Sequence, residues 1–235
     1  MQDFLLEIKT LLQSRMLISI YGKSGTGKTF LGLYLLGNLL TEKEPYHYQC
    51  IWIQACEFFP SKRLSQLFQK DLNKLQFLRN NIFITPLKKP FLSYQEQAVL
   101  ISQIQHKTLP PELKVIIIDN ISHHLRYEIS KYESISEKVS ILNDFYENQL
   151  FPLIMYCQQE NMILILIHEV SYNPNLKKIV PFLHKLYNRI DSINVYLEKN
   201  LLSENKILHL IYSDYNNQFN YRIENHGFQW IESLL

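Results

Sequence analysis

Residues 22–29 read Gly22-Lys23-Ser24-Gly25-Thr26-Gly27-Lys28-Thr29, and the prediction of the fold starts from this segment. It matches the pattern Gly-x-x-x-x-Gly-Lys-Ser/Thr at every fixed position. An apolar run, residues 16–21, comes directly before it, and residues 30–40 place leucines at helical spacing after it. Glycines let the backbone point its N–H groups at phosphate oxygens, and the following helix presents its positive end to the same anion. We therefore predict a strand, a phosphate-binding loop and a helix.

The loop also predicts a ligand. Lys28 can bridge the β- and γ-phosphates of a nucleotide, and the Thr29 hydroxyl can bind Mg²⁺. We expect Mg-ATP to be held by residues 22–30, which include Phe30, together with Asp119. The alternative is a chance glycine turn. It is disfavoured because the loop holds three of only six glycines in the chain and lies between a strand and a helix.

Two acidic residues complete the predicted site. Asp119 ends the run of four β-branched residues at 115–118, which is typical of a strand buried in a parallel sheet. There it would hold Mg²⁺ together with Thr29, although a strand-terminating turn is the alternative. Glu57 follows a predicted strand at 51–55 and should face the same edge, where it would orient the attacking water. A surface or helix-capping glutamate is the alternative. The predicted catalytic residues are Glu57 and Lys28.

The wider pattern predicts an α/β fold. Predicted strands at 16–21, 51–55, 82–84, 115–118 and 162–167 alternate with predicted helices at 30–40, 63–78, 93–106 and 136–159, the last of them broken near Pro152. This alternation indicates a doubly wound, mostly parallel sheet. Segments 193–197, 207–212 and 219–223 follow without intervening helices, which predicts antiparallel strands extending one edge. We expect one domain over residues 1–235, with an N-terminal helix at 1–14.

Composition excludes several classes. Apolar residues make up 46% and charged residues 20% of the 235, which is ordinary globular composition. A net charge of +2 is too small for nucleic-acid binding by bulk electrostatics, so a local patch would be needed. The three cysteines lack metal-ligand spacing, and we predict reduced thiols and no structural zinc. Without a basic signal region or a membrane-length apolar run, we expect a cytoplasmic protein, or a nuclear one in a eukaryote.

These segments together resemble the RecA-like recombinase superfamily, and within it the archaeal RadB-type paralogues that consist of the ATPase core alone. Residues 18–29 look like the family's first strand and Walker A loop. Residues 51–57, followed by Arg63, are similar to the segment that carries the family's catalytic glutamate. Residues 115–120 resemble its Walker B segment, residues 163–170 the strand before its second DNA-binding loop, and residues 197–199 a later strand.

The resemblance implies a DNA-repair ATPase with weak turnover that binds DNA, preferably single-stranded, or assists a recombinase or paralogue in a homo- or hetero-oligomer. The loops after residues 119 and 167 would then face DNA. Their candidate contacts are Arg126, Lys177, Lys178, Lys185 and Arg189. A solvated basic loop is the alternative. The chain departs from the family where His168-Glu169 replaces Asn-Gln, which puts coupling between the γ-phosphate and DNA in question.

Two other functions stay open. A KaiC-like regulatory ATPase shares this core and would bind a protein rather than DNA. A structural subunit would bind ATP to stabilise a hetero-oligomer without turnover. A GTPase is disfavoured because the chain has no Asn-Lys-x-Asp motif.

Overall fold

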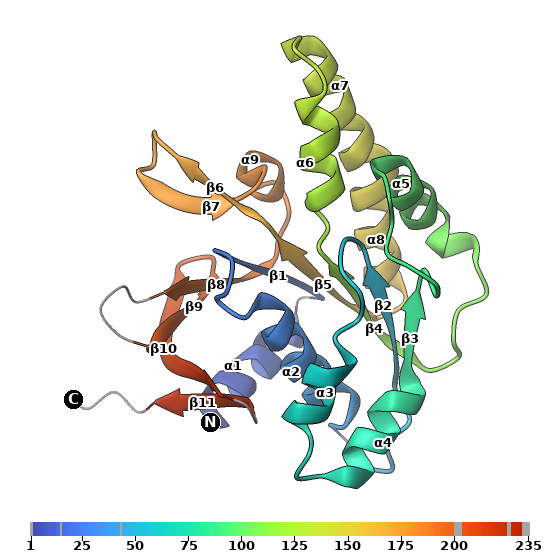
Figure 1. Cartoon of the computed structure of the whole chain (residues 1–235), viewed down its shortest axis with the longest axis vertical. Helices are drawn as coiled ribbons and strands as arrows, with labels where there is room; N and C mark the ends of the chain where they lie inside the picture. The colour runs from blue at the N-terminus through green and yellow to red at the C-terminus, as the bar shows by residue number, and fades with distance from the viewer. Residues whose placement is uncertain (1, 15, 43, 200–203, 225–226, 232–235) are drawn as a thin grey trace.

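The computed structural model describes residues 2–14, 16–42, 44–199, 204–224 and 227–231. Among these residues, nine strands form one sheet in the order β11-β10-β9-β8-β1-β5-β4-β2-β3 (Figure 1). The strands are β1 (Leu17–Gly22), β2 (Gln49–Gln54), β3 (Ile82–Thr85), β4 (Leu113–Asp119), β5 (Ile163–His168), β8 (Ile193–Lys199), β9 (Lys206–Tyr212), β10 (Tyr215–Glu224) and β11 (Gly227–Ile231).

Six neighbouring strands of this sheet run parallel, in the order β8, β1, β5, β4, β2 and β3. Strands β9, β10 and β11 continue the sheet beyond β8 as antiparallel neighbours. This confirms the predicted doubly wound, mostly parallel sheet with an antiparallel extension. One detail of the prediction is wrong, because β8 is itself parallel to β1, with Ile193 opposite Ile18. An alternating pattern records which side chains are buried, but strand direction depends on the connection that precedes the strand.

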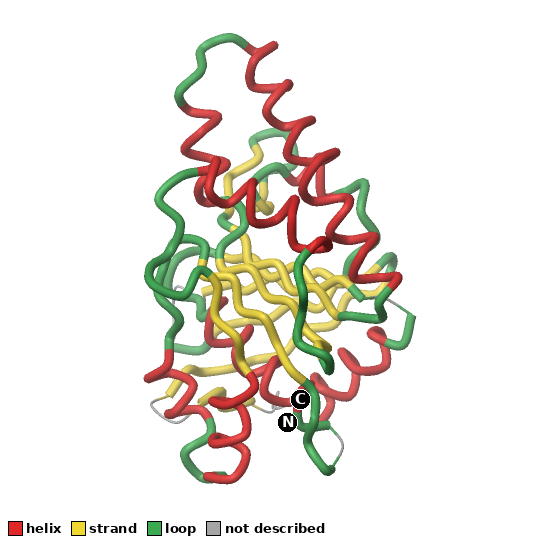
Figure 2. Tube along the Cα trace, turned by 90° about the vertical axis from the view of Figure 1, so that its right-hand side faces the viewer, coloured by secondary structure: helices red, strands yellow, loops and turns green. Residues whose placement is uncertain are grey.

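Helices cover both faces of the sheet (Figure 2). One face carries α1 (Gln2–Leu12), α2 (Lys28–Leu40), α3 (Ser61–Leu67) and α4 (Leu72–Asn81). The other carries α5 (Tyr94–Gln103), η1 (Ile104–His106), α6 (His123–Ser130), η2 (Phe145–Leu150) and α8 (Phe151–Gln159). Strand β4 serves both cores, since Val115 and Ile117 face the first and Ile116 and Ile118 the second. All four are fully buried, and each such isoleucine stabilises the fold by roughly 1.5–3 kcal/mol.

The predicted helix 63–78 is wrong in its extent, because the structure has two helices there. The Asp71 side chain accepts from the Lys74 backbone N–H at 2.9 Å and begins α4 as a new helix. Ser93 caps α5 in the same way through the Glu96 backbone N–H. Near Pro152 the predicted break is an irregular turn rather than an end of the helix: α7 (Ile135–Asp144) continues through the π-helical turn η2 into α8. The π-helical turn ends at Leu150, two residues before Pro152, whose missing N–H cannot continue the regular helical bonding.

Two segments that were expected from the sequence to be loops are ordered elements. Helix α6 follows β4. Only His124 and Leu125 of this helix are buried, so its mostly polar sequence lacks the apolar spacing that predicts a helix. Strands β6 (Val170–Asn173) and β7 (Lys178–Pro181) form a separate antiparallel hairpin after β5, followed by the short helix α9 (His184–Tyr187). Figure 1 shows this hairpin projecting from the main sheet. Within the described ranges, no helix is long and apolar enough to cross a membrane.

Candidate nucleotide-binding site

The phosphate loop connects β1 to α2. Gly25 and Gly27 have φ values of 75° and 95°, a left-handed conformation that residues with a Cβ adopt only with strain. Gly27 is the N-cap of α2, so the helix begins at Lys28. Thr26 is fully buried, and both its backbone N–H and its hydroxyl donate to the Lys23 carbonyl, at 3.3 and 2.9 Å. The loop therefore closes on itself in front of the positive end of a helix.

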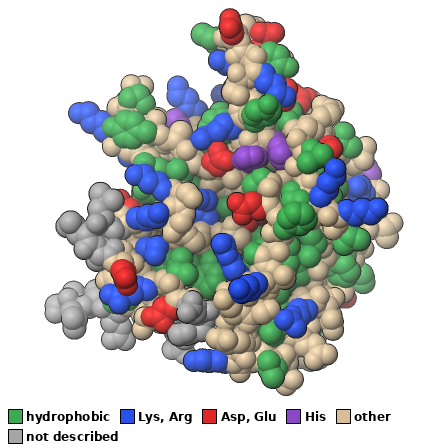
Figure 3. All heavy atoms as spheres, viewed as in Figure 1, with side chains coloured by type: hydrophobic (Ala, Val, Ile, Leu, Met, Phe, Trp, Pro, Cys, Tyr) green, Lys and Arg blue, Asp and Glu red, His purple; other side chains and the backbone are tan. Residues whose placement is uncertain are grey.

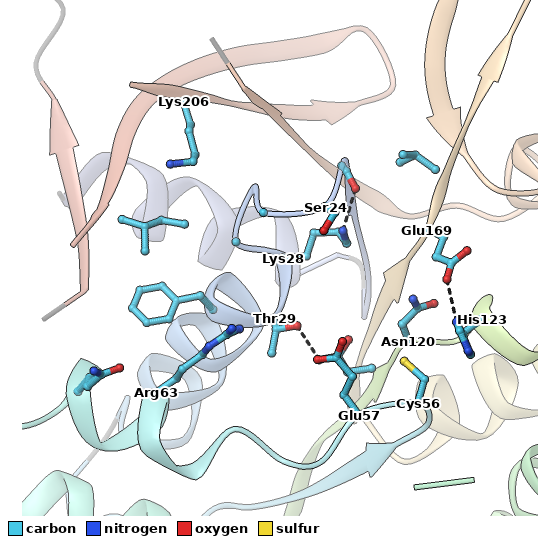
Figure 4. Close-up of a pocket in the computed structure, with 18 of the residues that line it drawn as sticks. Ser24, Lys28, Thr29, Cys56, Glu57, Arg63, Asn120, His123, Glu169 and Lys206 are labelled. Atoms are coloured by element: carbon cyan, nitrogen blue, oxygen red, sulfur yellow. Dashed lines mark hydrogen bonds and ion pairs between the residues drawn. The ribbon is translucent and has the colours of Figure 1, made fainter. Parts of the chain in front are cut away.

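Two side chains at the start of α2 point into the site (Figure 4). The Lys28 ammonium donates to the carbonyl oxygens of Gly22 and Lys23, at 2.8 and 3.3 Å, and burial lowers its pKa. The Thr29 hydroxyl donates to Asp119 Oδ2 at 2.8 Å. The structure therefore brings together the cation, the hydroxyl and the carboxylate that were expected from the sequence to bind phosphate and magnesium.

Asp119 ends β4, next to β5 and β2 in the sheet, at the edge where the parallel strands end. Burial raises the pKa of Asp119 to about 6, and the charge of Glu57 adds to that rise. The Thr29 hydrogen bond and the charges of Lys28 and Arg63 act in the opposite direction. A partly buried carboxylate beside a hydroxyl is a hard oxygen donor set, and its charged form gains stability from a nearby cation. These residues therefore fit a magnesium ion.

Glu57 lies on one wall of a cavity of about 820 Å³. The turn that carries it is held by Gln54, whose side-chain oxygen accepts from the Phe59 backbone N–H at 2.9 Å. Glu57 is exposed and makes no hydrogen bond to the described residues. The same cavity is lined by the loop glycines, Lys28, Thr29, Phe30, Cys56, Arg63 and Asp119. Burial raises the pKa of Cys56 to about 12, so its thiol stays protonated.

A second group of pocket residues was not predicted from the sequence as a unit. Glu169, the residue after β5, places its carboxylate 2.9 Å from His123 Nδ1 and 3.1 Å from Arg126 Nε. The backbone N–H of Glu169 donates to the Ser122 hydroxyl at 2.8 Å, which fixes its position. The sequence marked Glu169 as a departure from the family. Its pairing with α6 requires β4 and β5 to be neighbours, which only the sheet order establishes.

His168, the other departure, does not line this pocket and packs against Tyr187 of the second core. Its ring is fully buried and meets Tyr187 edge-on at 4.4 Å between centroids. Neither ring nitrogen has a hydrogen-bond partner within the described chain, and burial lowers the pKa of His168 to about 3. His168 is therefore a neutral core residue, and Glu169 alone of the two faces the pocket.

The predicted DNA contacts fall into two groups. Four of them are exposed on or beside the β6–β7 hairpin and α9, namely Lys177, Lys178, Lys185 and Arg189. Lysine and arginine side chains gather on this part of the surface, at the upper left of Figure 3. Asn173 on β6 and His184 on α9 lie 2.9 Å apart through Nδ2 and Nε2, which links the two elements. Arg126 lies apart from this group at the base of the hairpin. It lies on α6 rather than on a loop, and it donates to the Val170 carbonyl at 2.8 Å.

The antiparallel extension forms a third wall that was not expected at the site from the sequence. Lys206 of β9 and Ile223 and Glu224 of β10 line the cavity. Tyr221 of β10 donates its hydroxyl to the Thr26 carbonyl at 2.7 Å. No sequence signal marks these residues, because their place depends on how the last strands fold back beside β8.

Comparison with known proteins agrees with this architecture. The family model described as "AAA domain" matches residues 10–162, which contain the phosphate loop, Glu57 and Asp119. A solved structure described as "Crystal structure of the RadB recombinase" superposes with a TM-score of 0.67 and 20% sequence identity, over 92% of this chain and 91% of that chain. At that identity the likeness is one of fold, and it confirms the predicted RecA-like architecture. Since the family match covers more than half of the 235 residues, the chain belongs to the AAA domain family, in a form that folds like the RadB recombinase.

Proposed function

We propose that this chain binds Mg-ATP in the pocket, hydrolyses it slowly, and acts in DNA recombination or repair by contacting DNA or a recombinase partner. One observation carries the nucleotide part of this proposal. Thr29 and Asp119, 90 residues apart, meet at 2.8 Å directly beside Lys28 and the amides of the phosphate loop. A polyphosphate with a hard divalent cation is the ligand whose charges match this set.

The loop and the first turn of α2 would bind the phosphates. Lys28 would exchange its contacts with the carbonyls of Gly22 and Lys23 for β- and γ-phosphate oxygens, which offsets the burial penalty on its ammonium. Thr29 and Asp119 would hold the magnesium ion. When bound, magnesium neutralises charge on the phosphate oxygens. The aromatic ring of Phe30 would support the pocket floor beside the loop.

Hydrolysis requires a group that orients water, and Glu57 is placed for that role. Its exposed carboxylate has no competing hydrogen bond in the described structure, so it is free to accept one from a water molecule at the pocket wall. Slow turnover agrees with the contacts of Arg126. This guanidinium lines the pocket, but Glu169 and the Val170 carbonyl already engage it. It therefore does not lie free to stabilise charge developing on a γ-phosphate.

The basic residues of the hairpin and α9 support the DNA part. Four exposed cations lie within the segment that directly follows β5 and Glu169, and Tyr172 on β6 is 64% exposed. Lysine and arginine side chains bind backbone phosphates, and an exposed aromatic ring offers a stacking surface for unpaired bases. The hairpin would therefore receive a single strand while its base contacts the nucleotide pocket.

ATP hydrolysis, measured with and without single-stranded DNA, tests the proposal in wild type, Lys28→Ala and Glu57→Gln. We expect both substitutions to abolish turnover and Lys28→Ala to abolish binding as well. Lys74→Ala is a matched control, because Lys74 is also a partly buried lysine with a lowered pKa but lies on α4. Turnover that persists in Glu57→Gln would remove that residue from the role.

A KaiC-like regulatory ATPase, or a subunit that binds ATP without turnover, is the second candidate. Helix α7 favours it: none of its ten residues is buried, and Ile135 and Val139 are 79% and 47% exposed. An apolar helix face of this kind suits a protein partner. Nucleotide-dependent binding of a protein, without DNA affinity at low salt, would support this candidate over the first.

A further inference from the structure

The C-terminal strand β10 touches the phosphate loop at two points. The Tyr221 hydroxyl donates to the Thr26 carbonyl at 2.7 Å, although the residues are 195 positions apart. Two residues further on, Ile223 packs so closely against Gly27 that a Cβ there would overlap its Cδ1 atom. From these contacts we propose that Tyr221 is a positioning residue, which holds the phosphate loop in the conformation that receives phosphates. The inference rests on the proposed nucleotide binding.

The ring of Tyr221 is anchored independently of its hydroxyl. It is fully buried, and its centroid lies 5.2 Å from that of Phe228 on β11. Phe228 in turn lies 5.2 Å from Phe30, in the first turn of α2. Burial also raises the pKa of Tyr221, so the hydroxyl remains a hydrogen-bond donor. The ring is therefore held by packing, and the hydroxyl is the part that reaches the loop.

Thr26 is held from two directions. On one side its backbone N–H and hydroxyl donate to the Lys23 carbonyl. On the other side its own carbonyl accepts from Tyr221. The flanking glycines, Gly25 and Gly27, have the greatest conformational freedom of any residue type. A fixed Thr26 between them limits that freedom and keeps the loop in one shape.

The hydrogen bond from Tyr221 should affect nucleotide affinity through the fraction of molecules whose loop has the binding conformation. Several loop amides must face the phosphates at once, and a loop that spends part of its time in other shapes binds more weakly by that fraction. Tyr221→Phe deletes the hydroxyl and keeps the anchored ring. Loss of one buried hydrogen bond corresponds to a weakening of roughly 3- to 10-fold in affinity.

The experiment compares Tyr221→Phe with Tyr94→Phe in Mg-ATP titrations followed by calorimetry. Tyr94 is the matched control, because it is similarly buried and its hydroxyl accepts from Gln149 at 2.6 Å, but it lies on α5, on the opposite face of the sheet. Both variants lose a buried hydrogen bond and should lose similar stability. We expect weaker nucleotide binding in Tyr221→Phe alone. Hydrogen–deuterium exchange without nucleotide should be faster in peptides covering residues 22–29 of that variant, and unchanged there in Tyr94→Phe.

The outcomes separate the two proposals. If wild type does not bind Mg-ATP, the proposed function fails and this inference fails with it. If wild type binds and Tyr221→Phe binds equally well with unchanged loop exchange, only the positioning role is overturned. Equal weakening in both variants would show a general effect of stability and would also overturn it, as would a Tyr221→Phe protein that does not fold.

Discussion

Arg126 Nε lies 3.1 Å from Glu169 Oε2, and this ion pair joins the nucleotide pocket to the base of the β6–β7 hairpin. The same guanidinium donates to the Val170 carbonyl at 2.8 Å and lies 4.4 Å from the centre of the Phe182 ring, just after β7. The Nε–H is not directed at the carboxylate, so the pair is electrostatic while the directed bond goes to Val170. Arg126 therefore holds both ends of the hairpin beside a carboxylate that faces the pocket.

Glu169→Gln is expected to tighten Mg-ATP binding by roughly 3- to 10-fold, because it removes a negative charge from a wall that would face phosphates. Because Glu169 and Arg126 are partly exposed, the loss of folding stability should stay below about 1 kcal/mol. Calorimetric titration measures the affinity. Glu128→Gln is the control, since Glu128 of α6 pairs with Lys131, the residue after that helix, but does not line the pocket. Unchanged or weaker binding in Glu169→Gln would contradict the expectation.

Asp119→Asn is expected to stabilise the nucleotide-free fold while abolishing magnesium-dependent binding. The folded pKa of about 6 lies above the ordinary aspartate value of 3.8, so the charged form is disfavoured by folding. That cost, on the order of 1–3 kcal/mol, is fully present above pH 6 and disappears as pH falls toward the unfolded value. In denaturant unfolding, the free energy of unfolding of Asp119→Asn should therefore exceed that of wild type at neutral pH. The two values should be equal near the unfolded pKa. A variant less stable than wild type at neutral pH would refute this.

The pKa of Asp119 also sets the pH dependence of binding. Magnesium requires the carboxylate, so Mg-ATP affinity in wild type should fall as pH decreases through about 6. Over the same range the nucleotide-free protein becomes more stable, because protonation removes the cost of the charged carboxylate. As pH decreases, the affinity should therefore fall while the free energy of unfolding rises. Titrations across this range, with the free magnesium concentration held constant, check the result. Affinity that is flat through pH 6 would show that Asp119 does not control the metal.

Tyr187→Phe is expected to raise the free energy of unfolding by about 1 kcal/mol. The Tyr187 hydroxyl is buried and has no hydrogen-bond partner within the described residues, and the His168 ring packs edge-on against the Tyr187 ring. Deleting an unsatisfied polar group removes its desolvation cost. Chemical denaturation measures the change, with Tyr94→Phe, which loses a satisfied hydroxyl, moving in the opposite direction. A destabilised Tyr187→Phe would indicate that a bound water satisfies the hydroxyl.

Lys177→Ala with Lys178→Ala is expected to weaken binding to single-stranded DNA and to lower its salt dependence. The slope of log affinity against log salt should decrease by about 0.7 for each DNA phosphate that is no longer neutralised. The paired control is Lys88→Ala with Lys89→Ala, another exposed lysine pair after β3. Fluorescence anisotropy at several salt concentrations measures both. Equal weakening in the two double variants, or no binding by wild type at low salt, would remove the hairpin from the proposed DNA interaction.

Much of the site followed from the sequence because its determinants are local or follow from parallel pairing. The phosphate loop is contiguous, and its glycines and the helix after it specify their own geometry. Asp119 and Glu57 come from distant segments, but Asp119 ends a buried strand and Glu57 follows one, and the carboxyl ends of parallel strands meet at one edge. Helix α6 was not predicted, because its sequence is mostly polar and only His124 and Leu125 are buried, so no apolar spacing marks it as a helix.

The strand, loop and helix that form the anion site can be predicted from the amino-acid sequence alone, because those residues are neighbours and their backbone preferences agree. The contacts of Glu169 with Arg126 and of Tyr221 with Thr26 are visible only in the folded chain. These contacts depend on the order of strands in the sheet and on the direction in which the last strands return. Strand order results from packing the whole chain at once, and no local preference of a single segment encodes it.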